Sequence, residues 1–319
     1  MKSMQLPERV FGAEPGAFRE RFNRAAFQFP HTLGNHPLFN LSRLADLSKR
    51  LSRTGKATFQ TADSKVDQGW HVPGPDRVAS AADAISRIRE SGSWVLLKSV
   101  QDDEDYAALL RQCLRELEDV TGTNLRREIT WSDAYIFIAS PRALTPYHID
   151  HESNFLLQIH GDKELNVFDQ DDRSVLSEEE IERYYIGDLS SARYRPENQP
   201  KAKVFRLAAG TGVHQPPRAP HWVRNGEDYS VSLSILFFLR AFDLQARVYQ
   251  FNHCLRKLRL SPTPPGRSAL RDAMKILPLG NFGYTPRTKS DVIRFGYKKF
   301  TAPAVIGRRV VSRLLPKHS

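Results

Sequence analysis

The stretch Thr145–Phe168 reads TPYHIDHESNFLLQIHGDKELNVF. It has the pattern of two short strands, yet it also carries a histidine, an aspartate and a lysine. In a strand, residues i and i+2 point to the same side, so His148 and Asp150 would present an imidazole and a carboxylate on one face. Lys163 lies fifteen positions past His148 in an apolar segment. Because burying an unpaired lysine is costly, a buried Lys163 needs an anionic partner, such as a dicarboxylate.

The strand-like pattern continues over the region from Trp131 to Leu239. Short apolar or alternating segments are separated there by turn signals rich in Gly, Pro, Asn and Asp. Many short strands of this kind are typical of a sandwich or barrel. Ser177 and Glu180 have the spacing of a capping box, which predicts one helix over 177–185. The expected strands are 135–140, 154–161, 163–169, 203–210 and 229–239.

The region before these strands is predicted to be rich in helices, with one strand at 94–100. The expected helices are 15–26, 41–51, 80–91 and 102–120, with a loop at 29–39 between the first two. After Phe251 the sequence again favours helices. We therefore expect three regions, an α-rich N-terminal region packing on the core (1–125), a β-rich core (126–250) and a basic helical extension (251–319).

A third ligand from a distant strand would complete a set of two histidines and one carboxylate, which holds Fe(II) and leaves positions open for substrate and oxygen. Two histidines compete for this role, His214 and His221, both in the turn-rich segment GTGVHQPPRAPHWVRNG at 210–226. The triplet HID is weak evidence by itself, because the chain has 10 histidines and 36 acidic residues. The residues alone leave the choice of histidine open.

The segment Ile129–Asp169 resembles the core of the JmjC and cupin-like Fe(II)- and 2-oxoglutarate-dependent oxygenases, in particular their asparaginyl hydroxylases. A second segment, Gly210–Asn225, resembles the second cupin motif of that family, and its spacing selects His221 over His214. Arg218 stands where that motif usually has glycine. In the first segment the family's residues occur in order and without a gap, as Thr145, His148, Asp150, Asn154, Phe155, Gln158, Ile159, Gly161 and Lys163.

The resemblance implies a mainly β fold with α additions: a double-stranded β-helix (jelly-roll, cupin-like) with an α-rich N-terminal region and a helical C-terminal extension. It also implies that His148, Asp150 and His221 bind Fe(II). The co-substrate 2-oxoglutarate would be bound by five residues. Lys163 pairs with its distal carboxylate, Thr145 bonds the same group, Asn154 lies near its other end, Ser234 stands beside it on the last strand, and Tyr135 closes the pocket unless it is a core tyrosine.

The implied activity is that of an Fe(II)- and 2-oxoglutarate-dependent dioxygenase that hydroxylates a protein or peptide side chain and decarboxylates 2-oxoglutarate to succinate. A small-molecule hydroxylase with the same chemistry is compatible with every residue named. A non-catalytic cupin-like binding or regulatory module is the alternative of another class. Demethylation of chromatin would rest on the JmjC relationship alone.

The net charge of +11 is concentrated near the C-terminus, where Arg256–Ser319 holds 15 Lys or Arg against two Asp. Such a tail could contact nucleic acid, anionic lipid or an acidic partner, but without interleaved aromatic residues or a nucleic-acid motif the solvated face of C-terminal helices is the preferred interpretation. Apolar residues among the arginines of 305–315 suggest a homodimer through the C-terminal region. The longest apolar run, 235–239, is far short of the roughly 20 residues that cross a bilayer. The first residues lack the apolar segment of a signal peptide, so we expect a cytoplasmic protein without a transmembrane segment.

Overall fold

A computed structural model describes residues 6–12, 15–68, 78–277 and 291–293 of the chain. The chain divides into two compact units. The first is Met1–Leu176 with Ala192–Leu239, and the second is Ser177–Ser191 with Arg240–Ser319. All of the predicted site residues lie in the first unit.

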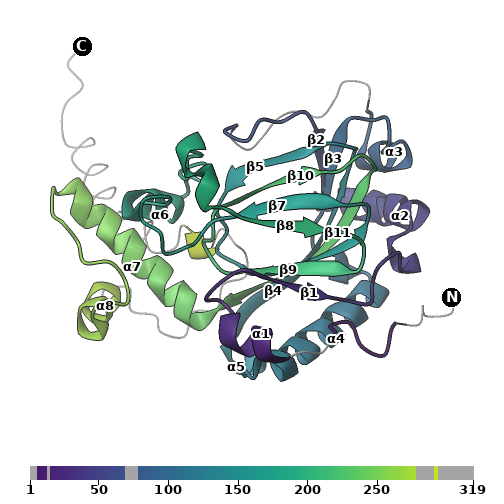
Figure 1. The fold of residues 1–319 in the computed structure, drawn as a ribbon. Helices are drawn as coiled ribbons and strands as arrows, with labels where there is room; N and C mark the ends of the chain where they lie inside the picture. The colour runs from purple at the N-terminus through teal and green to yellow at the C-terminus, as the bar shows by residue number, and fades with distance from the viewer. Residues whose placement is uncertain (1–5, 13–14, 69–77, 278–290, 294–319) are drawn as a thin grey trace, which may run out of the picture. The chain divides into compact units, whose positions relative to one another are not determined.

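The first unit contains two antiparallel sheets that face each other (Figure 1). The larger sheet has the strand order β1-β9-β6-β11-β4-β3-β2, and the smaller has β5-β10-β7-β8. From β4 onward the chain crosses between the sheets at every connection except that between β7 and β8, which are neighbours in the smaller sheet. Eight strands thus form the two four-stranded halves of a jelly-roll, which confirms the predicted fold class. These strands are β4 (Ile129–Ala139), β5 (Leu144–His148), β6 (Ser153–His160), β7 (Lys163–Val167), β8 (Lys203–Leu207), β9 (Thr211–Gln215), β10 (His221–Asn225) and β11 (Ser230–Leu239).

Apolar side chains from both sheets meet in a core between them. The β6 and β9 strands contribute Leu156 and Val213 to this core, and β7 contributes Leu165 and Val167. Burial of this apolar surface holds the two sheets together. The β6–β7 turn depends on Gly161, whose φ is 71° and where an added Cβ would lie 2.3 Å from the Tyr229 carbonyl oxygen. Only glycine fits both demands.

The outer face of the larger sheet is covered by the N-terminal elements. Every residue of β11 is buried, because its second face packs against these elements. An aromatic cluster fills this side, with Phe18 and Phe29 contacting Phe155 of β6. Helix α4 is capped by Asp103 and by Gly122, and it buries Cys113 completely. The N-terminal helices are α1 (Pro15–Arg21), α2 (Leu41–Ser52), α3 (Ala81–Ser86), α4 (Glu104–Thr121) and α5 (Leu125–Glu128), with 3-10 turns η1 (Pro37–Phe39) and η2 (Val100–Asp102).

The expectation of a single N-terminal strand is wrong, because the larger sheet is extended at both edges. In addition to β3 (Ser93–Leu97), the chain forms β1 (Phe27–Pro30), which pairs with β9, and β2 (Ala57–Thr61), which pairs with β3. The segment 210–226 was likewise expected to be rich in turns. It forms strands β9 and β10, with turns at Gly210 before β9 and between the two strands.

The second unit consists of α6 (Glu178–Tyr184), α7 (Arg240–Lys257) and α8 (Ala269–Ile276). The expected capping box is present at the start of α6, where Ser177 and Glu180 exchange hydrogen bonds. Arg256 of α7 forms two hydrogen bonds with the fully buried Glu182 of α6. Among the described residues, no helix is long and apolar enough to cross a bilayer.

Candidate active site

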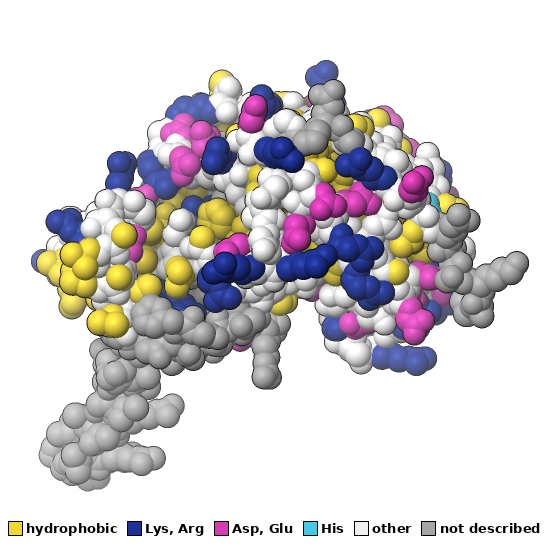
Figure 2. Space-filling model, turned by 90° about the horizontal axis from the view of Figure 1, so that it is seen from below, with side chains coloured by type: hydrophobic (Ala, Val, Ile, Leu, Met, Phe, Trp, Pro, Cys, Tyr) yellow, Lys and Arg dark blue, Asp and Glu magenta, His cyan; other side chains and the backbone are white. Residues whose placement is uncertain are grey.

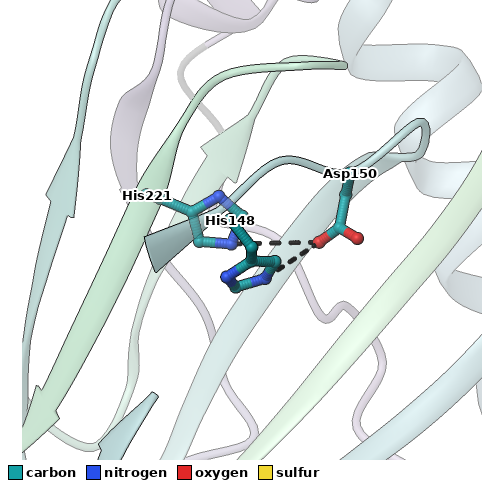
Figure 3. A group of neighbouring side chains, drawn as sticks. All are labelled: His148, Asp150 and His221. Carbon is teal, nitrogen blue, oxygen red and sulfur yellow. Dashed lines mark ion pairs between the residues drawn. The ribbon is translucent and has the colours of Figure 1, made fainter. Parts of the chain in front are cut away.

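Three side chains of ligand type meet at one end of the jelly-roll. The atoms that His148, Asp150 and His221 offer to a metal lie within 4.8 Å of one another. Asp150 Oδ2 is 3.3 Å from His148 Nε2 and 3.9 Å from His221 Nε2 (Figure 3). Ligands about 2.1 Å from one ion at right angles are about 3 Å apart. The spacing therefore suits three ligands on one face of a divalent ion, with the opposite face open.

Backbone carbonyls select the tautomer of both histidine rings. His148 Nδ1 is 2.7 Å from the Pro146 carbonyl oxygen, and His221 Nδ1 is 3.0 Å from the Ala219 carbonyl oxygen. A carbonyl only accepts hydrogen bonds, so each Nδ1 carries a proton and donates it. In a neutral ring of this tautomer the lone pair is on Nε2, which is the form that binds a metal.

The backbone that positions His148 and Asp150 differs from the single strand predicted for them. Strand β5 ends at His148, so Asp150 lies in the loop that follows and not on the strand. In the pairing of β10 with β5, His221 lies opposite His148 and Val223 lies opposite Thr145. His221 and Val223 are two positions apart but Thr145 and His148 are three, so β5 contains one extra residue. This bulge turns both His148 and Thr145 toward the interior.

The turn between β9 and β10 holds the Asp150 loop in place. The Arg218 backbone N–H donates a 2.6 Å hydrogen bond to the Asp150 carbonyl oxygen. Arg218 has a φ of 65°, which explains why the related motif usually has glycine there. The Asp150 side chain is 28% exposed, against 9% and 8% for the two histidines, so the site opens to solvent on the aspartate side.

The competing histidine, His214, points to the opposite face of β9. It is fully buried and stacks on Phe155, with ring centroids 4.4 Å apart. Its Nδ1 is 3.1 Å from the Asn154 carbonyl oxygen, and its Nε2 accepts a hydrogen bond from the Asn23 N–H. Burial lowers the pKa of His214 to about 3. It is a neutral core histidine, separated from the other three residues by its own strand.

Lys163 faces the interior together with the core residues Leu165 and Val167 of the same strand. Its side chain is buried, and burial lowers the pKa of its ammonium group to about 7. Among the described residues, no acidic group is placed to pair with it. In the smaller sheet Val167 lies opposite His221, and Lys163 lies opposite Asn225. Lys163 therefore lies four residues, or about 13 Å along β7, from Val167, the residue opposite His221.

The other predicted co-substrate residues also face the interior. On β11, Ser234 lies opposite Leu156 of β6 and Tyr135 of β4, so all three share the interior face. Ser234 Oγ is buried and has no hydrogen-bond partner in the described part of the chain. Leu236 lies opposite Asn154 one row closer to the Asp150 loop. The interior thus contains polar atoms that the protein itself does not satisfy.

One interior residue that sequence reasoning missed is Gln215, the last residue of β9. It lies opposite Asn154 and accepts a 2.7 Å hydrogen bond from the Asn154 Nδ2. The sequence offered only a weak signal, a glutamine inside the second motif, between Gly210 and His221. Once β9 is recognised as a strand, its alternation with the core residue Val213 predicts that Gln215 faces the interior.

Comparison with solved structures finds the same fold elsewhere. The X-ray structure of YcfD from Escherichia coli is 18% identical, with a TM-score of 0.50 over 86% of this chain and 70% of that chain. YcfD, described as a ribosomal oxygenase, also matches in complex with cobalt and 2-oxoglutarate (17% identical, TM-score 0.48, 86% and 68% of the chains). Its complex with cobalt and succinic acid matches with a TM-score of 0.47 (17% identical, 89% and 70%).

No protein-family model and no curated protein matches the sequence. The likeness to YcfD at 18% identity shows the fold. Together with the two facing antiparallel sheets, this likeness confirms the predicted fold class.

Proposed function

We propose that this protein is an Fe(II)- and 2-oxoglutarate-dependent oxygenase. The observation that carries the proposal is the grouping of His148, Asp150 and His221 at the end of a jelly-roll that also buries Lys163, for which the described part of the chain offers no acidic partner. A metal site explains the three ligand atoms. A dianionic co-substrate explains the lysine, because its carboxylate would supply the charge partner that the described residues do not provide.

The residues fit both groups. His148 and His221 would bind the metal through Nε2, and Asp150 through a carboxylate oxygen. Lys163 would bind the distal carboxylate of 2-oxoglutarate, with Thr145 and Tyr135 beside it. Asn154 and Ser234 would complete the co-substrate pocket, and Ser234 Oγ has an unsatisfied hydrogen bond to offer. When bound, iron and 2-oxoglutarate together supply the oxidising chemistry, and the protein supplies position, charge and exclusion of water.

The proposed substrate is a protein or peptide side chain. This part of the proposal rests on the resemblance of Ile129–Asp169 to protein hydroxylases and on the opening beside Asp150, whose exposed carboxylate faces solvent. A small-molecule substrate would enter by the same opening. The cytoplasmic location expected from the sequence stays a prediction.

We also propose a homodimer through the C-terminal region. The segment 305–315 that suggested it lies outside the described residues, but α8 gives separate support. Leu270 and Met274 of α8 and its C-cap residue Leu277 recur at helical spacing and are 72%, 57% and 64% exposed. Figure 2 shows hydrophobic side chains gathered over α8, at the left edge of the view. An exposed apolar stripe of this kind favours a partner surface. An acidic partner for the basic tail stays a prediction.

The proposed activity is tested by anaerobic titration of the iron-loaded protein with 2-oxoglutarate. We expect a weak visible charge-transfer band, followed by slow release of succinate when O2 is admitted. The His221→Ala variant serves as the control and should give neither signal. Bound iron without a band would instead favour a cupin-like module that uses its metal differently or only binds.

A further inference from the structure

The interior amide pair of Asn154 and Gln215 is incompletely bonded. Asn154 Nδ2 donates to Gln215 Oε1 at 2.7 Å. The other two polar atoms of the pair, Asn154 Oδ1 and Gln215 Nε2, are buried and have no hydrogen-bond partner among the residues that the structure describes. Gln215 is only 3% exposed. Leaving a buried amide group without a partner is unfavourable, so this pair is suited to a ligand that completes its bonding.

The pair lies at the metal end of the barrel. Asn154 is the second residue of β6, four positions after Asp150, and Gln215 is the last residue of β9, six positions before His221. The two connecting segments are joined to each other, since the Arg218 N–H bonds the Asp150 carbonyl oxygen. Both amides therefore stand on the row of the larger sheet that is nearest to the ligand-bearing loops.

We infer that Gln215 is a further residue of the co-substrate site, which orients the Asn154 amide and donates from Nε2 to the carboxylate of the 2-oxo acid that lies beside the metal. This inference rests on the proposed function. Lys163, which starts four residues from the histidine end of the smaller sheet, serves the opposite end of the same molecule. Asn154 Oδ1 is left to accept from a water molecule or from a substrate N–H.

A matched glutamine elsewhere in the interior has its bonds completed by the protein. Gln158 donates from Nε2 to the His160 carbonyl oxygen and to Ser230 Oγ, and its Oε1 accepts from Ser232 Oγ at 2.7 Å. It is fully buried on the same strand as Asn154. Gln158 therefore has a structural role, whereas Gln215 keeps bonding capacity for a ligand.

The experiment compares two probes by titration of the iron-loaded protein under anaerobic conditions. One probe is 2-oxoglutarate, and the other is 2-oxopentanoate, which lacks the distal carboxylate. We expect Gln215→Met to weaken both probes by the same factor, roughly 10-fold or more, because it removes a hydrogen bond to a charged group. Lys163→Met should weaken 2-oxoglutarate alone. Gln215→Glu keeps the shape of the side chain and should weaken both probes further through charge repulsion.

Two further readouts separate this role from a packing role. Metal content should be unchanged in both Gln215 variants, since no ligand is removed. Gln158→Met should lower the melting temperature without changing the affinity for either probe. The inference is overturned if both Gln215 variants bind the two probes as the wild type does, or if only 2-oxoglutarate is weakened. If the wild type binds neither probe, the proposed function itself fails.

Discussion

Two histidines of the second motif, His214 and His221, differ in what their loss should do to the metal. Substitutions that only disturb a ligand's surroundings typically cost 10–100-fold in metal affinity. Because His148→Ala removes a ligand outright, it should lose iron by more than about 100-fold, and His221→Ala should match it.

His214→Ala should retain iron but unfold more easily, by roughly 2–4 kcal/mol, because it leaves a cavity beside Phe155 and an unsatisfied Asn23 N–H. Iron content after gel filtration and urea denaturation measure the two effects. Equal loss of iron in all three variants would contradict the assignment of His214 to the core.

The lowered pKa of Lys163 predicts that co-substrate binding depends on pH. Its pKa is lowered to about 7 without a ligand, and a bound carboxylate would raise it again. Binding of 2-oxoglutarate should therefore take up a proton above pH 7, and affinity should fall by up to about tenfold per pH unit as the pH rises. Calorimetry in buffers of different ionisation enthalpy measures the uptake. Lys163→Met should bind weakly at every pH and take up no proton, and an unchanged pH profile would argue against the pocket.

Among individual residues, the sequence predicted those whose chemistry is unusual for their surroundings. His148, Asp150 and Lys163 are conspicuous in an apolar, strand-like segment. In the structure His148 and Asp150 lie with His221 at one end of the barrel, and Lys163 is buried in the barrel interior. Gln215 was missed, because a glutamine is ordinary in a turn and becomes notable only when β9 places it opposite Asn154.

Among the elements, the turn between β9 and β10 contains a residue in a glycine-type conformation. Arg218 has a φ of 65°, which costs a residue with a side chain roughly 1–2 kcal/mol. Both Arg218→Gly and Arg218→Ala lose the buried guanidinium, but only glycine relieves the backbone. We expect the glycine variant to be more stable than the alanine variant by about 1 kcal/mol in urea denaturation. Equal stability would mean that the turn changes its conformation when the side chain is removed.

Elements with strong local signals were predictable, and elements that depend on distant pairing were not. The α2 and α4 helices show a 3.6-residue period, and α6 has its capping box. By contrast β1 has only four residues, and its backbone is held by β9 from the far end of the unit. Nothing local in the sequence reports such a partner.

For the whole molecule, the exposed stripe of α8 predicts the oligomeric state. Leu270→Glu combined with Met274→Glu should convert a dimer to a monomer of 36.4 kDa in sedimentation velocity, because it places charges in the apolar contact. Arg271→Glu, which changes an exposed neighbour outside the stripe, should leave the dimer intact. A wild type that already sediments as a monomer would remove the proposal.

The division of the chain into units was not visible in the sequence. The pattern placed Ser177–Ser191 within the β-rich core, since strands precede and follow it. In the structure this segment belongs to the second unit, where α6 packs with α7 and Glu182 binds Arg256. Its capping box predicts where the helix begins but does not identify the surface against which the helix packs.

The pairing of β1 with β9 has a consequence for synthesis on the ribosome. His31 and Thr211, which bond each other beside this pair, are 180 positions apart. At 5–20 residues per second, the N-terminal segment waits about 9–36 s for its partner strand to be made. During that time its phenylalanines are without the sheet that later covers them. The nascent chain is therefore expected to need protection by a chaperone until β9 has emerged.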